Sequence, residues 1–216
     1  MGIIVVNFKA YRESVGRNAV ELAKKICSRR FDGVHISAAV QPSDISGVSM
    51  IMPVLAQHVD AADFGAFTGH FIPEAAKESG AEGVVINHSE MPLDLKTIEK
   101  TIARSKSCGL KTLVCAATPE MVSAVSFFNP DIISIEPPAL IGTGKASSQF
   151  MPGIISGAVK GSRGIPLICG AGIAAADDVR KAVELGCAGI MLSSAVVKSE
   201  KPEEKIKELA EGLSGK

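Results

Sequence analysis

Residues 133–145 read Ile133-Ser134-Ile135-Glu136-Pro137-Pro138-Ala139-Leu140-Ile141-Gly142-Thr143-Gly144-Lys145. The stretch opens with a short apolar run, reaches a carboxylate where the run ends, and continues into two prolines and a Gly-Thr-Gly tip. The apolar run is typical of a buried strand, and the proline- and glycine-rich continuation is typical of a hinged loop. The pattern predicts that Glu136 stands at a strand end, beneath a flap formed by residues 137–145.

Short apolar runs of the same kind recur along the whole chain. Eight of them occur, at residues 3–8, 34–39, 50–56, 83–87, 111–116, 131–135, 166–169 and 188–192. Most are followed by a helix-like segment, and the clearest of these segments are 13–30, 94–108, 176–186 and 203–213. The segments after the second and third runs look short or irregular. Runs that are apolar throughout indicate parallel strands buried on both faces.

Eight parallel strands joined by right-handed crossovers can close into a barrel or lie in an open, doubly wound sheet. The strand count favours the barrel, and no change of composition marks a linker. The sequence therefore predicts an α/β protein in which residues 1–216 form a single (β/α)8 barrel domain, with some helices shortened or missing. In such a barrel the residues that follow the strands line the active face.

Composition excludes several kinds of partner. Lysine and arginine together number 23, as do aspartate and glutamate, so no net charge favours nucleic acid or an anionic membrane. No apolar run approaches the ~18 residues of a membrane span, and the N-terminus lacks a signal-peptide pattern. We expect a cytoplasmic protein that binds neither nucleic acid nor membrane.

The cysteines and histidines show no metal-binding pattern. The five cysteines make an odd number and include no Cys-x-x-Cys pair, which fits reduced, mostly buried thiols. The four histidines lack the spacing of metal ligands. We expect no metal site.

Polar residues follow the first and fourth runs. Asn7 and Lys9 come after the first, where they are either a turn with a solvated lysine or an amide and a cation that meet an anionic substrate. His88 follows the fourth and is either a structural histidine or an electrophile. Ser89 and Glu90 are typical of residues that open a helical turn, whose free N–H groups would keep the imidazole neutral. A neutral imidazole can donate a hydrogen bond to a substrate oxygen.

Glu136 also has two interpretations. It could be a surface carboxylate paired with a nearby lysine. Against this, it stands between the apolar run and Pro137-Pro138, which are suited to fixing its direction. We interpret Glu136 as a general base.

Small residues follow the last two runs. Gly170-Ala171-Gly172 follows the seventh and Ser193-Ser194-Ala195 follows the eighth. Small residues let backbone N–H groups approach a ligand, and many barrels bind phosphate after strands seven and eight. Residues 170–175 also match the dinucleotide fingerprint G-x-G-x-x-G/A, but too few units follow them to complete a nucleotide-binding sheet.

Together these segments resemble the triosephosphate isomerase family. The matching segments are Asn7-Phe8-Lys9, Gly65-Ala66-Phe67-Thr68-Gly69, Asn87-His88-Ser89-Glu90, residues 136–145, Gly170-Ala171-Gly172 and Leu192-Ser193-Ser194. They occur in the family's order and with similar spacing, from residue 3 to about residue 198.

The resemblance implies an aldose–ketose isomerase of glycolysis and gluconeogenesis that acts on a triose phosphate without a cofactor. It assigns the proton-abstracting base to Glu136 and the electrophile to His88; this Glu-base and neutral-His assignment comes with the family. Lys9 would stabilise negative charge, Asn7 would orient the substrate, and Glu90 would support the site from beside the histidine. The resemblance also implies that the substrate is bound by Asn7, Lys9, Ile141, Gly142, Gly172, Ser193 and Ser194.

The chain departs from the common pattern in ways that resemble the short archaeal branch of the family. It is shorter than the ~250 residues typical of the barrel, Ala139 stands where the flap usually carries Trp, and Gly172 stands where many members carry Ser. Ser193-Ser194 replaces the more common Gly-Gly or Ala-Ser pair. The resemblance implies a homotetramer, with a homodimer as the alternative.

Two other functions stay open from the sequence. The first is another phosphate-binding barrel enzyme, an aldolase or a synthase, for which Lys9 is the candidate Schiff-base residue. The second is a non-catalytic barrel that binds a sugar phosphate.

Overall fold

Eight parallel strands form a closed barrel at the centre of the structure, a computed structural model that describes residues 2–140 and 145–214. Each strand pairs with the next along the chain, and the last pairs with the first. The strands are β1 (Gly2–Asn7), β2 (Val34–Val40), β3 (Val54–Ala56), β4 (Gly83–Ile86), β5 (Lys111–Ala116), β6 (Ile132–Ile135), β7 (Leu167–Cys169) and β8 (Gly189–Leu192). The predicted (β/α)8 barrel is confirmed.

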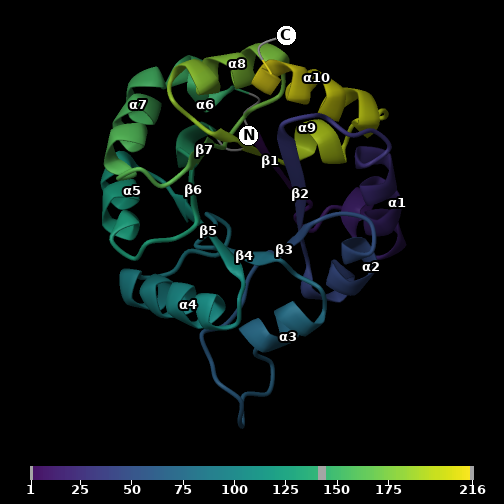
Figure 1. Cartoon of the computed structure of the whole chain (residues 1–216), viewed down its shortest axis with the longest axis vertical. Coiled ribbons are helices and arrows are strands. Elements are labelled where there is room, and N and C mark those ends of the chain that lie inside the picture. Colours follow the sequence, from purple (N-terminus) through teal and green to yellow (C-terminus); the bar gives the residue numbers. More distant parts are fainter. Residues whose placement is uncertain (1, 141–144, 215–216) are drawn as a thin grey trace.

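Helices form an outer ring around the strands (Figure 1). They are η1 (Arg12–Ser14), α1 (Arg17–Ile26), η2 (Pro42–Asp44), α2 (Ile45–Ser49), α3 (Pro73–Glu78), α4 (Leu95–Ser107), α5 (Pro119–Ser126), η3 (Pro138–Leu140), α6 (Ser147–Phe150), α7 (Pro152–Gly161), α8 (Ala176–Glu184), α9 (Ser194–Val197) and α10 (Pro202–Ser214). The helices α2 and α3, which follow the second and third strands, have only five and six residues, as the sequence suggested.

Two predicted elements differ from the structure. The run at 50–56 becomes a strand only from Val54, because α2 ends at Ser49 and a turn follows it. The helix expected at 13–30 is divided into η1 and α1 by Gly16, whose φ of 62° is incompatible with a right-handed helix.

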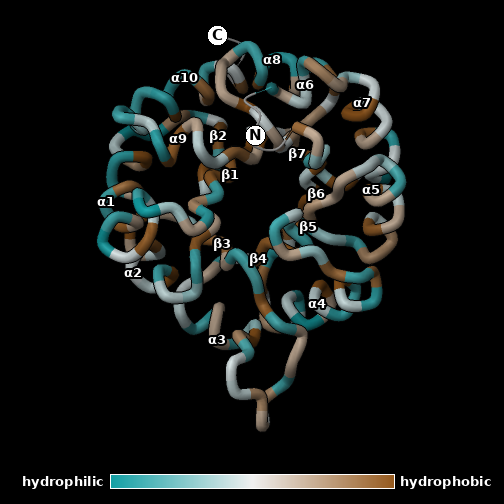
Figure 2. The backbone as a smooth tube through the Cα atoms, turned by 180° about the vertical axis from the view of Figure 1, so that it is seen from behind, coloured by the Kyte–Doolittle hydropathy of each residue, from teal (hydrophilic) through white to brown (hydrophobic). Residues whose placement is uncertain are grey.

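The strands are apolar throughout because both of their faces are buried. Alternate residues point into the barrel, where Val5, Leu113, Ile168 and Met191 form the inner cluster. The residues between them point outward and pack against the helices in a second, larger cluster. Figure 2 shows this pattern as brown segments on the strands and mixed teal and brown on the helices.

The connection between β3 and α3, residues 57–72, projects from the barrel at the bottom of Figure 1. Arg104 on α4 holds this connection by contacting the Asp63 carboxylate at 3.1 Å and the Ala62 carbonyl at 3.1 Å. Arg104 also contacts the Glu74 carboxylate on α3 at 2.7 Å. None of the described helices is both long and apolar enough to cross a membrane.

Candidate active site

A cleft of about 460 Å³ opens where the strands end. Parallel strands all run in one direction, so the residues that follow them meet on one rim of the barrel. Seven of the predicted site residues line this cleft, namely Asn7, Lys9, His88, Glu136, Gly172, Ser193 and Ser194.

Lys9 enters the cleft from a strained backbone position two residues after the end of β1. Its φ is 50°, a value uncommon for residues other than glycine, and its N–H donates to Asn7 Oδ1 at 3.0 Å. Gln57, which follows β3, places Nε2 3.1 Å from the Lys9 carbonyl and 3.2 Å from Asn7 Oδ1. The Lys9 side chain is only 15% exposed, which fits a residue of the cleft better than a solvated surface lysine.

His88 is oriented by the turn that follows β4. Asn87, with a φ of 61°, donates from Nδ2 to the Cys115 carbonyl and accepts from the Leu93 N–H, both at 2.8 Å. The Glu90 N–H donates to His88 Nδ1 at 3.2 Å. A neutral ring that accepts at Nδ1 carries its proton on Nε2, which makes Nε2 a donor toward the cleft.

The predicted helical turn at Ser89 is a single hydrogen-bonded turn. It is closed by the Met91 N–H, which donates to the His88 carbonyl at 2.8 Å, and α4 begins only at Leu95. The backbone donor that reaches the imidazole is therefore one N–H of a turn and not a helix N-terminus.

Glu136 follows β6 and is only 6% exposed. Its Oε2 lies 3.5 Å from His88 Nε2, and its Oε1 accepts from Ser134 Oγ at 2.9 Å and lies 3.5 Å from Cys115 Sγ. These contacts contradict the alternative in which Glu136 is a surface carboxylate paired with a lysine.

Gly170, directly after β7, makes room for the Glu136 side chain. Its N–H donates to the Ile135 carbonyl at 2.9 Å, which places the two strand ends side by side. A Cβ at position 170 would lie 2.4 Å from Glu136 Cγ, a distance that real Cβ atoms do not reach. Only glycine fits here without moving the carboxylate.

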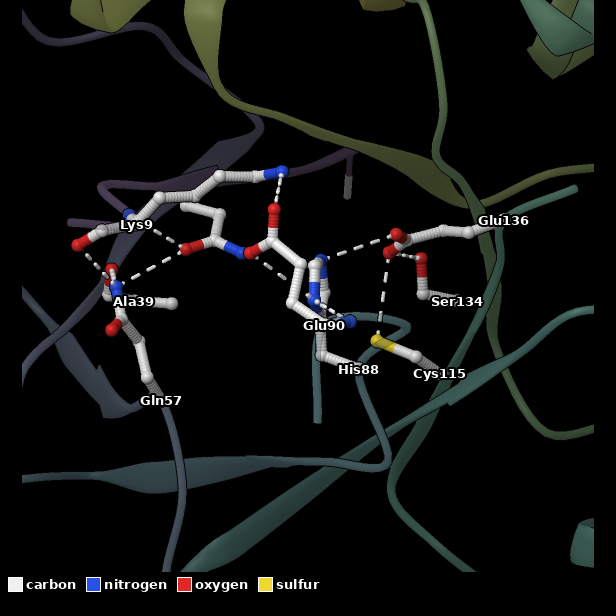
Figure 3. A network of polar contacts seen from close by, with 9 residues as sticks. Lys9, Ala39, Gln57, His88, Glu90, Cys115, Ser134 and Glu136 are labelled. Carbon is white, nitrogen blue, oxygen red and sulfur yellow. Dashed lines mark hydrogen bonds and ion pairs between the residues drawn. The ribbon is translucent and has the colours of Figure 1, made fainter. Parts of the chain in front are cut away.

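Figure 3 shows a continuous polar network across the rim. Lys9 Nζ lies 2.7 Å from Glu90 Oε1, and Glu90 Oε2 lies 3.7 Å from His88 Nδ1. His88 then faces Glu136 on its other side. A cation, an imidazole and a carboxylate from three different strand ends are thus held in one chain of contacts, with Glu90 reaching in from the edge.

The opposite part of the cleft is formed by Gly172, Ser193 and Ser194. Gly172 has a φ of 76°, and a Cβ there would lie 1.9 Å from the Lys145 carbonyl oxygen. Ser193 precedes the short helix α9, and its buried Oγ has no hydrogen-bond partner among the described residues. Small side chains leave this part of the cleft open to a ligand. The other two predicted binding residues, Ile141 and Gly142, lie outside the described residues.

The described part of the chain contains no group of three or more His, Cys, Asp or Glu side chains that could hold a metal ion. All five cysteines are free thiols. Burial, together with the neighbouring Glu136 charge, raises the pKa of the Cys115 thiol well above its usual value. Cys115 is therefore a neutral thiol beside the carboxylate.

Three residues of the network have no role in the sequence interpretation. Ser134 lies inside β6, Cys115 inside β5, and Gln57 directly follows β3. Gln57 could have been found by the same rule that identified Lys9 and His88, because it is a polar residue after a strand. Ser134 and Cys115 carry no such signal, since they sit inside apolar runs.

Comparison with known proteins places this site in a family. The family model described as triosephosphate isomerase matches residues 2–210. The triosephosphate isomerase of Sulfurisphaera tokodaii is 45% identical over 207 residues, which cover 93% of this chain and 90% of the relative. That of Saccharolobus solfataricus is 43% identical over 95% of this chain and 93% of the relative, and that of Methanocaldococcus jannaschii is 39% identical over 96% and 98%. The chain belongs to the triosephosphate isomerase family and is an isomerase.

Proposed function

We propose that this chain interconverts dihydroxyacetone phosphate and glyceraldehyde 3-phosphate, with Glu136 as the general base. The observation that carries the proposal is the approach of Glu136 Oε2 to His88 Nε2, at 3.5 Å, in a cleft that Lys9 also lines. A base and a hydrogen-bond donor so placed can serve two adjacent atoms of a small substrate.

In the proposed reaction Glu136 Oε2 removes a proton from the substrate carbon that carries the hydroxyl. The electron pair moves toward the carbonyl, giving an enediolate with negative charge on oxygen. His88 Nε2–H donates a hydrogen bond to that oxygen, and the Lys9 ammonium stabilises its charge. Glu136 returns the proton to the neighbouring carbon. The hydroxyl proton leaves the first oxygen and reaches the former carbonyl oxygen through His88 Nε2, so the aldose and ketose interconvert with no net change in protons or electrons.

In this proposal the contact with Glu90 helps to hold the Lys9 ammonium over the cleft. Glu90 is 58% exposed and reaches both Lys9 and His88, so we propose that it supports the site from outside. Asn7 would orient the substrate beside Lys9, because its Oδ1 fixes the Lys9 N–H and leaves its amide on the cleft wall.

We assign the phosphate end of the substrate to Gly172, Ser193 and Ser194. These residues line the part of the cleft with the smallest side chains, where backbone N–H groups can approach an anion. The roles of Ile141 and Gly142 stay predictions.

The test is turnover of glyceraldehyde 3-phosphate in a coupled assay, comparing the wild type with Glu136→Gln. Loss of a general base should lower kcat by ~10²–10⁴. Glu99→Gln, at an exposed carboxylate on α4, is the control and should keep full activity. Near-normal turnover by Glu136→Gln would show that Glu136 is not the general base. An inactive wild type that borohydride traps with substrate would instead indicate a Schiff-base aldolase.

We also propose that residues 1–216 act as one catalytic domain in a cytoplasmic homo-oligomer, with a tetramer as the expected form. The projecting segment 57–72 supports an oligomer because Phe64 is 77% exposed and Phe67 is 44% exposed there. Sedimentation of the wild type and of Phe64→Ser would test the proposal. A wild type that sediments as a monomer at micromolar concentration would contradict it.

A further inference from the structure

Ser134 stands two residues before Glu136, so the pleat of β6 turns both side chains toward the barrel interior. The flanking Ile133 and Ile135 pack outward against the helices. Ser134 is completely buried, inside a run that is otherwise apolar. A hydroxyl in such a place costs stability unless it has a partner.

The partner of that hydroxyl is the carboxylate of Glu136. Ser134 Oγ donates to Oε1 at 2.9 Å, a distance suited to a charge-assisted hydrogen bond. Cys115 lies directly opposite Ser134 in the register of β5 and β6, and its Sγ approaches the same Oε1 at 3.5 Å. Two donors from adjacent strands therefore converge on one oxygen.

The other oxygen of the carboxylate has a different environment. Oε2 lies 3.5 Å from His88 Nε2 on the cleft side, while Gly170 leaves room beneath the side chain. All of these contacts come from strands β4 to β7 or from the residues that directly follow them. Residues within the barrel strands thus hold Oε1, whereas Oε2 faces a histidine in the turn after β4.

We propose that Ser134 is a positioning residue for the base: its hydroxyl holds Oε1 inside the barrel, so that Oε2 is the oxygen presented to the substrate carbon. This inference rests on the proposed function, since it requires that Glu136 be the base. The Ser134 hydroxyl also gives a buried carboxylate oxygen a charge-assisted hydrogen bond.

The test is the pH profile of kcat/KM for Ser134→Ala. The titratable groups that face Glu136 are His88 from β4, Cys115 from β5 and Cys169 from β7, with Lys9 and Glu90 beyond His88. All of them remain in the variant. Without the donor, the carboxylate loses stabilisation of its charged form. The fall of kcat/KM on the acidic side of its pH profile, the acid limb, should therefore move to higher pH by about one unit.

Two kinetic readouts separate positioning from general loss of stability. On the pH plateau, kcat should fall several-fold while KM changes little, because the base and not substrate binding is affected. The control is Ser126→Ala, which removes a buried hydroxyl that donates to the Ser123 carbonyl on α5 and has no contact with the site. This control should leave the acid limb in place.

Ser134→Cys keeps a weaker donor of similar size and should place the acid limb between those of the wild type and Ser134→Ala. If Ser134→Ala folds poorly, the pH profile of Ser134→Cys provides the test. An acid limb that stays in place in both variants, with kcat unchanged, would overturn the role of Ser134. Full activity in Glu136→Gln would instead overturn the proposed function.

Discussion

The ammonium of Lys9 lies 2.7 Å from the carboxylate of Glu90, although 81 positions separate the two residues in the sequence. The pair joins the end of β1 to the turn after β4. Glu90 is 58% exposed and Lys9 only 15%, so the pair lies at the boundary between cleft and solvent. In the proposed function, Glu90 keeps the lysine pointed across the cleft before substrate binds.

Lys9→Ala should raise KM and lower kcat. In the proposed reaction the cation interacts with an anionic substrate both on binding and as charge develops. Its loss should therefore affect both constants, with a combined fall in kcat/KM of at least about 100-fold. Steady-state kinetics measures this. Lys24→Ala is the matched control, since Lys24 pairs with Glu21 on the exposed face of α1. Unchanged kinetics in Lys9→Ala would favour the alternative in which Lys9 is a solvated lysine with no role in the reaction.

Gly170→Ala should lower kcat with little change in KM. The added Cβ would lie 2.4 Å from Glu136 Cγ, so the carboxylate must shift, and a misplacement of ~1 Å can cost about 100-fold in rate. Gly157→Ala, on helix α7, is the control, because a Cβ at position 157 would meet Pro119 at an ordinary 3.5 Å. The control should keep activity and gain about 0.5–1 kcal/mol of stability, from the higher helix propensity of alanine. Equal activity in the two variants would show that Gly170 does not constrain the base.

Gln57→Leu should raise KM and destabilise the protein. Gln57 Nε2 contacts the Lys9 carbonyl, Asn7 Oδ1 and the Ala39 carbonyl at 3.1–3.2 Å, and leucine satisfies none of them. Loss of a partner for a buried polar group costs about 1–3 kcal/mol. Denaturant unfolding and kinetics are the measurements, with Gln149→Ala, at an exposed glutamine, as the control. Unaltered KM would mean that Lys9 keeps its position without Gln57.

The stability of the protein should depend on the charge of Glu74 at low pH. The Arg104 guanidinium beside Glu74 holds the pKa of that carboxyl below its ordinary value of 4.5. A folded-state pKa below the unfolded one contributes stability above the unfolded pKa and loses it as pH falls through the folded one. The difference in unfolding free energy between the wild type and Glu74→Gln should thus stay constant above about pH 5.5 and shrink below about pH 4.5.

Glu78→Gln is the control for Glu74, since Glu78 is an exposed carboxylate on the same helix. Its difference from the wild type should show no such trend. If Glu74→Gln behaved in the same way, the ion pair with Arg104 would contribute nothing to the pH dependence.

Much of the barrel could be predicted from the chain because one physical signal repeats. A parallel strand buried on both faces needs an unbroken apolar run, and eight such runs are visible. Element boundaries were less accurate, as at residues 50–56, where apolar residues also belong to the turn after α2. There a local run cannot distinguish a strand from a buried turn.

The site was partly predictable for a topological reason. Lys9, His88 and Glu136 each lie within two residues of a strand end, and in a barrel all such positions share one rim. Gln57 obeys the same rule but follows a strand of only three residues, in a run whose first residues belong to a turn. The role of Ser134 could not be predicted, because a lone serine inside an apolar strand does not indicate which side chain it contacts.

The sequence by itself predicted eight parallel strands and placed the carboxylate at 136 and its companions near strand ends, because strands buried on both faces need unbroken apolar runs. Only the tertiary structure decided which oxygen of Glu136 faces His88 and which is held by Ser134 and Cys115. The reason is register: the pairing of Cys115 with Ser134 brings two donors to one atom, and pairing across strands leaves no trace in the local sequence. The carboxylate of Glu136, the proposed base, is therefore oriented by donors inside the barrel.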